Sequence, residues 1–223
     1  MKPKRIILIR HGESEGNVNK KLYGQIPDYA LELTPKGEKQ AFRAGQELRE
    51  IVKNESLFFY VSPSWRTRGT FEQIIKGLDS VNFDYIEEPR IREQEWGHLR
   101  NLEECFKVEL QRDSYGTFYY RIPDGESGAD VFDRISGFLG TMYLNFEKED
   151  YPENTVIITH GMSIRLFLMH WFHWTVEEFE VLAIPKNCEI VTLEKNENDK
   201  YVLLKELRKH ESIYHTFQIP IKL

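Results

Sequence analysis

Short apolar runs alternate with longer amphipathic stretches along this chain, and each pattern predicts a different element. Runs of β-favouring residues predict strands at 6–9, 57–62, 83–86 and 155–159, with a closing hairpin of 190–193 and 201–204. Apolar residues at helical spacing predict helices over 35–52, 65–76, 102–120, 127–145 and 164–171. Segment 18–33 has no clear period and predicts a long loop that includes a short helical turn. The alternation predicts an α/β fold, a three-layer αβα sandwich with a mostly parallel central sheet.

The chain length favours a single domain over residues 1–223. A chain of this size buries roughly 70% of its unfolded surface. No linker, tandem repeat or low-complexity segment divides it. The composition is that of an ordinary globular protein, which excludes wholesale disorder.

The charge balance narrows the classes of partner. A net charge of −6 and a pI of about 5.7 exclude a general nucleic-acid or anionic-membrane binder. An anionic ligand must therefore be held by a local cluster of cations that works against the overall field. The oligomeric state is left open, with a homodimer as one option.

The two cysteines, Cys105 and Cys188, are far apart and give neither a disulfide framework nor the spacing of a zinc site. The apolar run behind the N-terminal basic residues is too short for a signal peptide. No stretch approaches the roughly 20 apolar residues that span a bilayer. We therefore expect a cytoplasmic protein with no membrane partner.

Two predicted strands end in the same way. The run 6–9 ends in Arg10-His11-Gly12, and the run 155–159 ends in His160-Gly161. Ligands bind at the carboxyl ends of parallel strands in α/β sheets. If these two strands are parallel neighbours, both imidazoles lie in one crevice, and Arg66, just after the strand at 57–62, adds a guanidinium.

This combination predicts phosphoryl transfer. Arg10 and Arg66 can grip phosphate oxygens through charge-assisted hydrogen bonds, and helix starts such as the one at Gly161 add backbone N–H donors. One neutral imidazole could attack phosphorus, and the other could donate a hydrogen bond to the developing charge. The acidic segment 89–97 supplies candidate proton donors. A facial metal triad of two histidines and a glutamate is the alternative, but the adjacent arginines favour an anion, so we expect no metal.

At these residues the sequence resembles the histidine phosphatase superfamily, also called phosphoglycerate mutase-like. Five motifs carry the resemblance in the family's order over roughly residues 4–195: Arg10-His11-Gly12 with Glu13, Ser14 and Asn17; Ser62-Pro63 with Arg66 and Thr70; Ile91, Glu93, Trp96 and Gly97; Gly125-Glu126-Ser127; and Thr159-His160-Gly161. The family's fold agrees with the one predicted above, and the resemblance implies a helical insertion at about residues 98–125.

The resemblance also implies roles. His11 is the nucleophile that becomes phosphorylated, and Glu93 is the general acid and base, with Glu95 as the fallback. The implied phosphate-binding residues are His160, Arg10, Arg66, Asn17 and Gly161. Candidate substrate-binding residues are Ser14, Trp96 and Arg121. No cofactor is implied for a phosphatase, whereas a mutase would need 2,3-bisphosphoglycerate.

Phosphatases and mutases share this site. Mutases of the family carry a lysine after the acid segment, an adjacent arginine pair in the insertion and an asparagine after the second His-Gly. This chain has Asn101-Leu102-Glu103-Glu104, the single Arg121 and Met162 at those places. The pattern is closer to the broad-range phosphatase branch, so we expect a phosphatase that acts on a small phosphorylated metabolite. A phosphoglycerate mutase is the alternative, and a non-catalytic phospho-ligand binder the third hypothesis.

Several residues keep two interpretations. His170 and His173 could form a ligand pair, although their aromatic neighbours favour packing. Arg68 and Arg165 could approach phosphate or form structural salt bridges. Three more residues could belong either to the site or to the surrounding structure: Glu126, Tyr119 and Tyr120.

Overall fold

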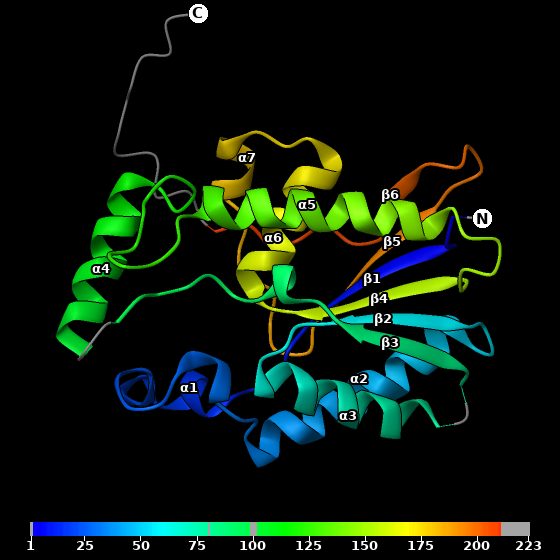
Figure 1. Cartoon of the computed structure of the whole chain (residues 1–223), viewed down its shortest axis with the longest axis horizontal. Coiled ribbons are helices and arrows are strands. Elements are labelled where there is room, and N and C mark those ends of the chain that lie inside the picture. The colour runs from blue at the N-terminus through cyan, green and yellow to red at the C-terminus, as the bar shows by residue number, and fades with distance from the viewer. Residues whose placement is uncertain (1, 80, 99–101, 211–223) are drawn as a thin grey trace, which may run out of the picture.

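A computed structural model describes residues 2–79, 81–98 and 102–210 of the chain (Figure 1). Within these residues, six strands form one sheet in the order β3-β2-β4-β1-β5-β6. The strands are β1 (Arg5–Arg10), β2 (Leu57–Val61), β3 (Phe83–Glu87), β4 (Asn154–Thr159), β5 (Ile190–Lys195) and β6 (Tyr201–Leu203). The first four strands pair in parallel, and β5 runs antiparallel to both β1 and β6. The predicted strands, the closing hairpin and the mostly parallel sheet are confirmed.

Helices cover both faces of the sheet (Figure 1). On one face lie α2 (Pro35–Val52) and α3 (Trp65–Leu78), and on the other lie α5 (Gly128–Phe146), α6 (Gly161–Phe172) and the short α7 (Val176–Glu180). At one end of the molecule, away from the N-terminus, stand α4 (Leu102–Tyr115) and the short α1 (Glu15–Val18). This arrangement confirms the three-layer sandwich.

The central strand β1 explains why its end is a ligand site. Ile6 and Leu8 face the cluster under α5 and α6, whereas Ile7 and Ile9 face the cluster under α2 and α3. Because the strand is buried on both faces, its sequence is a continuous apolar run. The first polar side chains after that run therefore emerge at the carboxyl edge of the sheet.

The start of α2 holds the segment that follows β1. Thr34 caps the helix, since its Oγ1 accepts a hydrogen bond from the Gly37 N–H at 3.0 Å, and Pro35 occupies the first helical turn. A Cβ at position 37 would collide with the carbonyl of Glu13. Glycine at this position therefore lets the segment after His11 pack directly against the helix.

Several predicted boundaries needed correction. The helix predicted over 102–120 ends at Tyr115, because Gly116 adopts a φ of 109° that breaks the helix. The loop 18–33 contains two short 3₁₀ helices, η1 (Lys20–Gly24) and η2 (Asp28–Ala30), and a third, η3 (Pro89–Ile91), lies in the acidic segment. The sequence did not predict α7.

Parts of the predicted organisation fall beyond the described residues. Residues 99–101, which include Asn101 of the mutase comparison, lie outside them, as does the C-terminal segment 211–223, to which the sequence assigned no role. No helix within the described ranges is long and apolar enough to cross a membrane.

Candidate active site

His11 and His160 lie side by side because their strands are paired neighbours. The β1–β4 register aligns Arg10 with Thr159, and the His11 N–H donates to the Thr159 carbonyl at 2.9 Å. The two imidazole centroids are 5.2 Å apart, with the rings inclined by 60°. Both side chains are buried. The structure thus brings together the two histidines that the strand ends predicted.

The hydrogen bond of His11 fixes which ring nitrogen is free. Its Nδ1 lies 2.7 Å from the Gly12 carbonyl oxygen. A carbonyl can only accept, so Nδ1 carries the proton and Nε2 keeps its lone pair. Burial, aided by the charges of Arg66 and Arg10, holds the pKa of His11 well below its usual 6.5. The ring is therefore neutral and its free nitrogen nucleophilic.

His160 is held by Ser62, which the sequence singled out only as part of the Ser62-Pro63 motif. Its Nε2 lies 2.8 Å from the Ser62 hydroxyl at the end of β2. Its Nδ1 is buried and has no hydrogen-bond partner among the described residues. Burial and the charge of Arg66 hold the pKa of His160 well below its usual value. One polar atom of a neutral imidazole is thus left for a ligand.

Two guanidiniums flank these rings. Arg66, at the start of α3, is 2% exposed, and its Nη2 pairs with the Asp28 carboxylate at 2.8 Å. The Nη1 of Arg10 donates to the Pro185 carbonyl at 2.7 Å, while its buried Nε has no partner within the described chain. A buried guanidinium without an ion pair is costly unless an anion arrives.

The N-terminus of α6 completes this anion site. The helix begins at Gly161, directly after His160, so its first N–H groups have no intrahelical partners and favour an anion. A Cβ at position 161 would lie 3.6 Å from Arg10 Nε. The predicted residue Gly161 therefore lies beside the arginine.

Asn17 and Ser14 lie at the start of α1, beyond His11. The Asn17 Oδ1 accepts from the Ser14 N–H at 3.1 Å and from Asn187 Nδ2 at 3.1 Å. The same Asn187 group donates to the His11 carbonyl at 3.0 Å. The Ser14 hydroxyl is buried and unpartnered among the described residues. Both predicted residues are thus tied to the backbone that carries His11.

Glu93 occupies the acidic segment, facing the arginines. Its Oε1 accepts from the Gln94 N–H at 3.0 Å. Burial raises the pKa of Glu93, although the Gln94 bond and the charges of Arg66 and Arg10 act in the opposite direction. A carboxyl that stays protonated above its usual range suits a general acid. Glu95, the fallback, is exposed.

Arg134 of α5 anchors the segment that carries Glu93. It donates to the carbonyls of Arg90, Arg92 and Glu93 at 2.6, 2.9 and 3.0 Å. It also pairs with Glu126 at 3.0 Å, and both side chains are largely buried. Glu126 additionally accepts from the Glu95 N–H at 3.0 Å. Glu126 therefore helps to fix the loop, while a secondary role in the site stays a prediction.

Two of the candidate substrate-binding residues, Trp96 and Arg121, have different surroundings. The guanidinium carbon of Arg112 lies over the Trp96 ring, 5.2 Å from the ring centroid. Arg121 is exposed, pairs with Asp130 at 2.6 Å and donates to the Gly125 carbonyl. Within the described part of the chain, neither of these contacts of Arg121 involves a histidine, so its role stays a prediction.

Three residues near the site were missed from the sequence, and the role of a fourth, Ser62, was not predicted. Ser62 contacts His160, Asp28 pairs with Arg66, and Asn187 joins Asn17 to the His11 backbone. Burial raises the pKa of Tyr23, on which Arg66, Asp28, Glu93 and Arg10 also act. The Ser62-Pro63 motif gave a signal for the first. Nothing in local spacing marks the others, because Tyr23 and Asp28 come from short 3₁₀ helices and Asn187 from a loop.

The structure also bears on other residues that kept two interpretations. His170 Nε2 shares a hydrogen bond with the Ser136 hydroxyl at 2.9 Å. The ring centroids of His170 and Phe132 are 5.1 Å apart, and both contacts favour a structural role for His170. Arg68 forms a salt bridge with Glu87 at 2.7 Å. In the described ranges, no three His, Cys, Asp or Glu side chains gather as a metal cluster.

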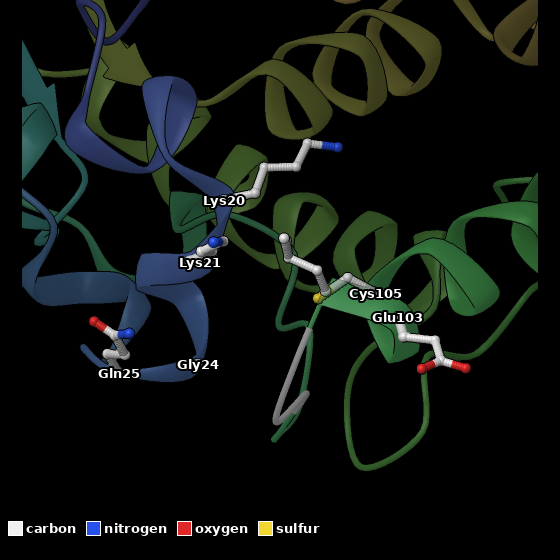
Figure 2. Close-up of a pocket in the computed structure, with 7 residues that line it drawn as sticks. Lys20, Lys21, Gly24, Gln25, Glu103 and Cys105 are labelled. Atoms are coloured by element: carbon white, nitrogen blue, oxygen red, sulfur yellow. The ribbon is translucent and has the colours of Figure 1, made fainter.

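A surface cavity of about 420 Å³ opens between η1 and the start of α4 (Figure 2). Its lining residues are Lys20, Lys21, Gly24, Gln25, Leu102, Glu103 and Cys105. The lining includes neither histidine, so this cavity is distinct from the imidazole pair. It is bounded by the same two elements that carry Tyr23 and Arg112.

Comparisons with known proteins show which family and fold this chain resembles. The model of the histidine phosphatase superfamily (branch 1) matches residues 6–207. The chain is 40% identical to the phosphoglycerate mutase-like protein AT74H of Arabidopsis thaliana, over 90% of this chain and 77% of that protein. It is 30% identical to the broad-range acid phosphatase DET1 of Saccharomyces cerevisiae, over 93% of this chain and 90% of that protein. A solved structure named mycobacterial hydrolase 1 matches with a TM-score of 0.72 and 20% identity, over 93% of this chain and all of that one.

Proposed function

Because this chain belongs to the histidine phosphatase superfamily (branch 1), we propose that it is a metal-independent phosphomonoesterase that acts on a small phosphorylated metabolite through a phosphohistidine. The observation that carries the proposal is the buried, neutral imidazole pair, 5.2 Å apart, with two guanidiniums beside it. The two guanidiniums supply the positive charge that a phosphate needs. The uncharged imidazole keeps a lone pair and can therefore attack phosphorus as a nucleophile.

In the first step, the Nε2 lone pair of His11 attacks phosphorus, and the bond from phosphorus to the leaving oxygen breaks. Glu93 gives its proton to that oxygen, which departs as an alcohol. In the second step, the water oxygen attacks phosphorus and the bond from phosphorus to Nε2 of His11 breaks, while the Glu93 carboxylate takes a proton from the water. Phosphate leaves, and the neutral imidazole and protonated carboxyl return.

The neighbouring groups stabilise the charge that spreads over the phosphoryl oxygens. If the Ser62 hydroxyl donates to Nε2 of His160, Nδ1 carries the proton and becomes a free donor to a phosphoryl oxygen. Arg10 Nε and the first N–H groups of α6 add donors. Arg66 supplies a further charge and stands in an ion pair with Asp28 until a substrate arrives.

The test is phosphate release from p-nitrophenyl phosphate, followed by trapping of ³²P-labelled protein under alkaline conditions that preserve phosphohistidine. We expect wild type to turn over and to carry label, and His11→Ala to do neither. Full activity in His11→Ala would overturn the nucleophile assignment. His170→Ala is the matched control, since that imidazole bonds Ser136 away from the site.

A second candidate function is a phosphoglycerate mutase. It is supported by relatives such as the probable phosphoglycerate mutase GpmB of Erwinia tasmaniensis, 30% identical over 83% of this chain and 78% of that protein. Incubation with 3-phosphoglycerate separates the two. A phosphatase releases free phosphate, whereas a mutase forms 2-phosphoglycerate and depends on 2,3-bisphosphoglycerate.

A further inference from the structure

The loop that leads into β5 packs against the end of β1. The Pro185 carbonyl accepts a hydrogen bond from Arg10 Nη1 at 2.7 Å. The Cys188 N–H donates to the Arg10 carbonyl at 3.0 Å and to the His11 carbonyl at 3.3 Å. The loop is therefore fixed against the strand end that carries the proposed nucleophile.

Two features fix the shape of this loop around Asn187. Cys188 adopts a φ of 57°, a left-handed conformation that a residue other than glycine seldom keeps unless its surroundings enforce it. The Glu189 carboxylate accepts from the Lys186 N–H at 2.6 Å and so closes the loop. Asn187 lies between these two restraints, and its backbone is therefore held in one place.

The side-chain amide of Asn187 has only one possible orientation. Its Nδ2 donates to the His11 carbonyl at 3.0 Å and to Asn17 Oδ1 at 3.1 Å. A backbone carbonyl can only accept a hydrogen bond, so the atom of Asn187 that faces His11 must be the nitrogen. The backbone of the nucleophile thus determines which group Asn187 presents to Asn17.

The same reasoning fixes the amide of Asn17. The Ser14 N–H can only donate, so the atom of Asn17 that faces it at 3.1 Å is Oδ1. The Asn187 donor faces that same oxygen. Two N–H groups therefore hold Oδ1, whereas Nδ2 of Asn17 has no hydrogen-bond partner among the residues that the structure describes. The free group of Asn17 is a donor.

We propose that Asn187 is a positioning residue, which holds the Asn17 amide so that its Nδ2 is free to donate to a phosphoryl oxygen beside His11. The oxygens of a phosphoryl dianion can only accept hydrogen bonds, so an Asn17 amide turned the other way would present its own oxygen and repel them. The inference rests on the proposed function and adds to it a residue from outside the five motifs of the sequence. Asn187 acts through Asn17.

A double-mutant cycle tests the proposal, with calorimetric Kd values for inorganic phosphate as the measurement. We expect Asn17→Ala to weaken phosphate binding about 10-fold and Asn187→Ala about fivefold, because the first removes a hydrogen bond to a charged ligand and the second only the support for it. Once Asn17 is absent, Asn187 has nothing to position. The double variant should therefore bind phosphate within about twofold of Asn17→Ala alone.

The matched control is Asn196→Ala, at the opposite end of β5. Asn196 Oδ1 accepts from the N–H groups of Asn198 and Lys200 in the closing hairpin. This variant removes a loop asparagine of the same kind and should keep the wild-type Kd for phosphate. Urea unfolding of each protein shows whether a weaker Kd accompanies a loss of folding.

A spectroscopic measurement reports on the amide itself and does not require Asn187→Ala to fold. The side-chain N–H₂ resonances of Asn17 are identified in a ¹H–¹⁵N spectrum by their absence from Asn17→Ala. We expect them to shift when inorganic phosphate is added to wild type, and to shift less in Asn187→Ala. Resonances that stay in place on wild type overturn the proposal.

The remaining outcomes separate this proposal from the proposed function. If the effects of Asn17→Ala and Asn187→Ala on the phosphate Kd simply add, Asn187 acts independently of Asn17 and the positioning role is refuted, whatever the protein hydrolyses. If wild type releases no phosphate from any ester, the phosphatase proposal fails, while a non-additive cycle in the phosphate Kd still supports Asn187.

Discussion

His11 and His160 stand at the ends of two paired strands, whereas Glu93 stands in a loop between η3 and α4. We call the first group, with Arg10 and Arg66, the strand-end half of the site, and the segment Glu93–Trp96 with Arg112 the acid-loop half. Backbone hydrogen bonds of the sheet set the geometry of the strand-end half. Side chains hold the acid-loop half, chiefly those of Arg134, Glu126 and Gln94, whose Nε2 donates to the Glu126 carbonyl.

The difference teaches where this site can vary. A strand end cannot move without disturbing the register of its neighbours. A loop tied by side chains can change with a few substitutions, and loops are where substrate preference commonly lies. We therefore expect changes in the strand-end half to affect every substrate, and changes in the acid-loop half to affect substrates according to their leaving group.

The largest effect should come from Glu93→Gln. Loss of a general acid costs about 100-fold to 10,000-fold in kcat, and the loss should be greatest for alkyl phosphates, whose alkoxides need a proton. p-Nitrophenyl phosphate, with a leaving group that departs unprotonated, should suffer much less. Steady-state kinetics on both substrates measure the ratio. An equal loss of kcat on both substrates would contradict the expectation that changes in the acid-loop half depend on the leaving group.

Arg134→Met should test how the acid-loop half is held. Removing one member of a buried ion pair costs about 3 kcal/mol or more. The carbonyls of Arg90, Arg92 and Glu93 would also lose their donor, while Glu126 would keep its pair with Arg92. Urea unfolding measures the loss. Arg121→Met is the control, since its pair with Asp130 is exposed and worth less than about 1 kcal/mol. Similar midpoints for the two variants would contradict the anchoring role.

The pH profile of kcat/KM should report the ionisation of one group from each half of the site, His11 and Glu93. Reaction requires neutral His11, whose lowered pKa puts the acid limb well below pH 6.5, and protonated Glu93, whose raised pKa puts the basic limb above pH 4.5. Activity should fall about tenfold per pH unit beyond each limb. Glu93→Gln should abolish the basic limb alone. A variant that keeps that limb would assign it to another group.

Ser62→Ala should have the smallest effect and should act within the strand-end half. It removes one buried hydrogen bond to His160, worth about fivefold in kcat/KM, and the loss should be the same for every leaving group. Ser136→Ala removes the same kind of bond from His170 at 2.9 Å, away from the site, and should leave kinetics unchanged. If both variants lose activity alike, the effect is one of general folding.

The strand-end half was predictable because local sequence determines it. A continuous apolar run that stops at a polar residue marks the end of a buried strand, and β1 and β4 carry the same ending. Helix α2 was predicted to the residue, since Thr34 and Pro35 mark its start. By contrast, α7 has five residues, too few to show a helical period.

The acid-loop half was predictable only in part. The family resemblance pointed to Glu93, but nothing in spacing shows that Arg134 reaches back to its carbonyl from 41 residues away. Arg112 lies within a predicted helix whose orientation depends on packing against Trp96. The candidate Arg121, from the same insertion, pairs with Asp130, and its substrate-binding role stays a prediction. Long-range side-chain contacts of this kind have no local signature.

The pairing of β1 also has a consequence for synthesis on the ribosome. β1 leaves the exit tunnel first, but both of its neighbours, β4 and β5, come from the last third of the chain. β2 and β3 can pair much earlier. At bacterial or eukaryotic elongation rates, β1 therefore waits on the order of ten seconds for its first partner. A nascent chain that ends before β4 has only one of the two imidazoles, so an incomplete product lacks half of the histidine pair.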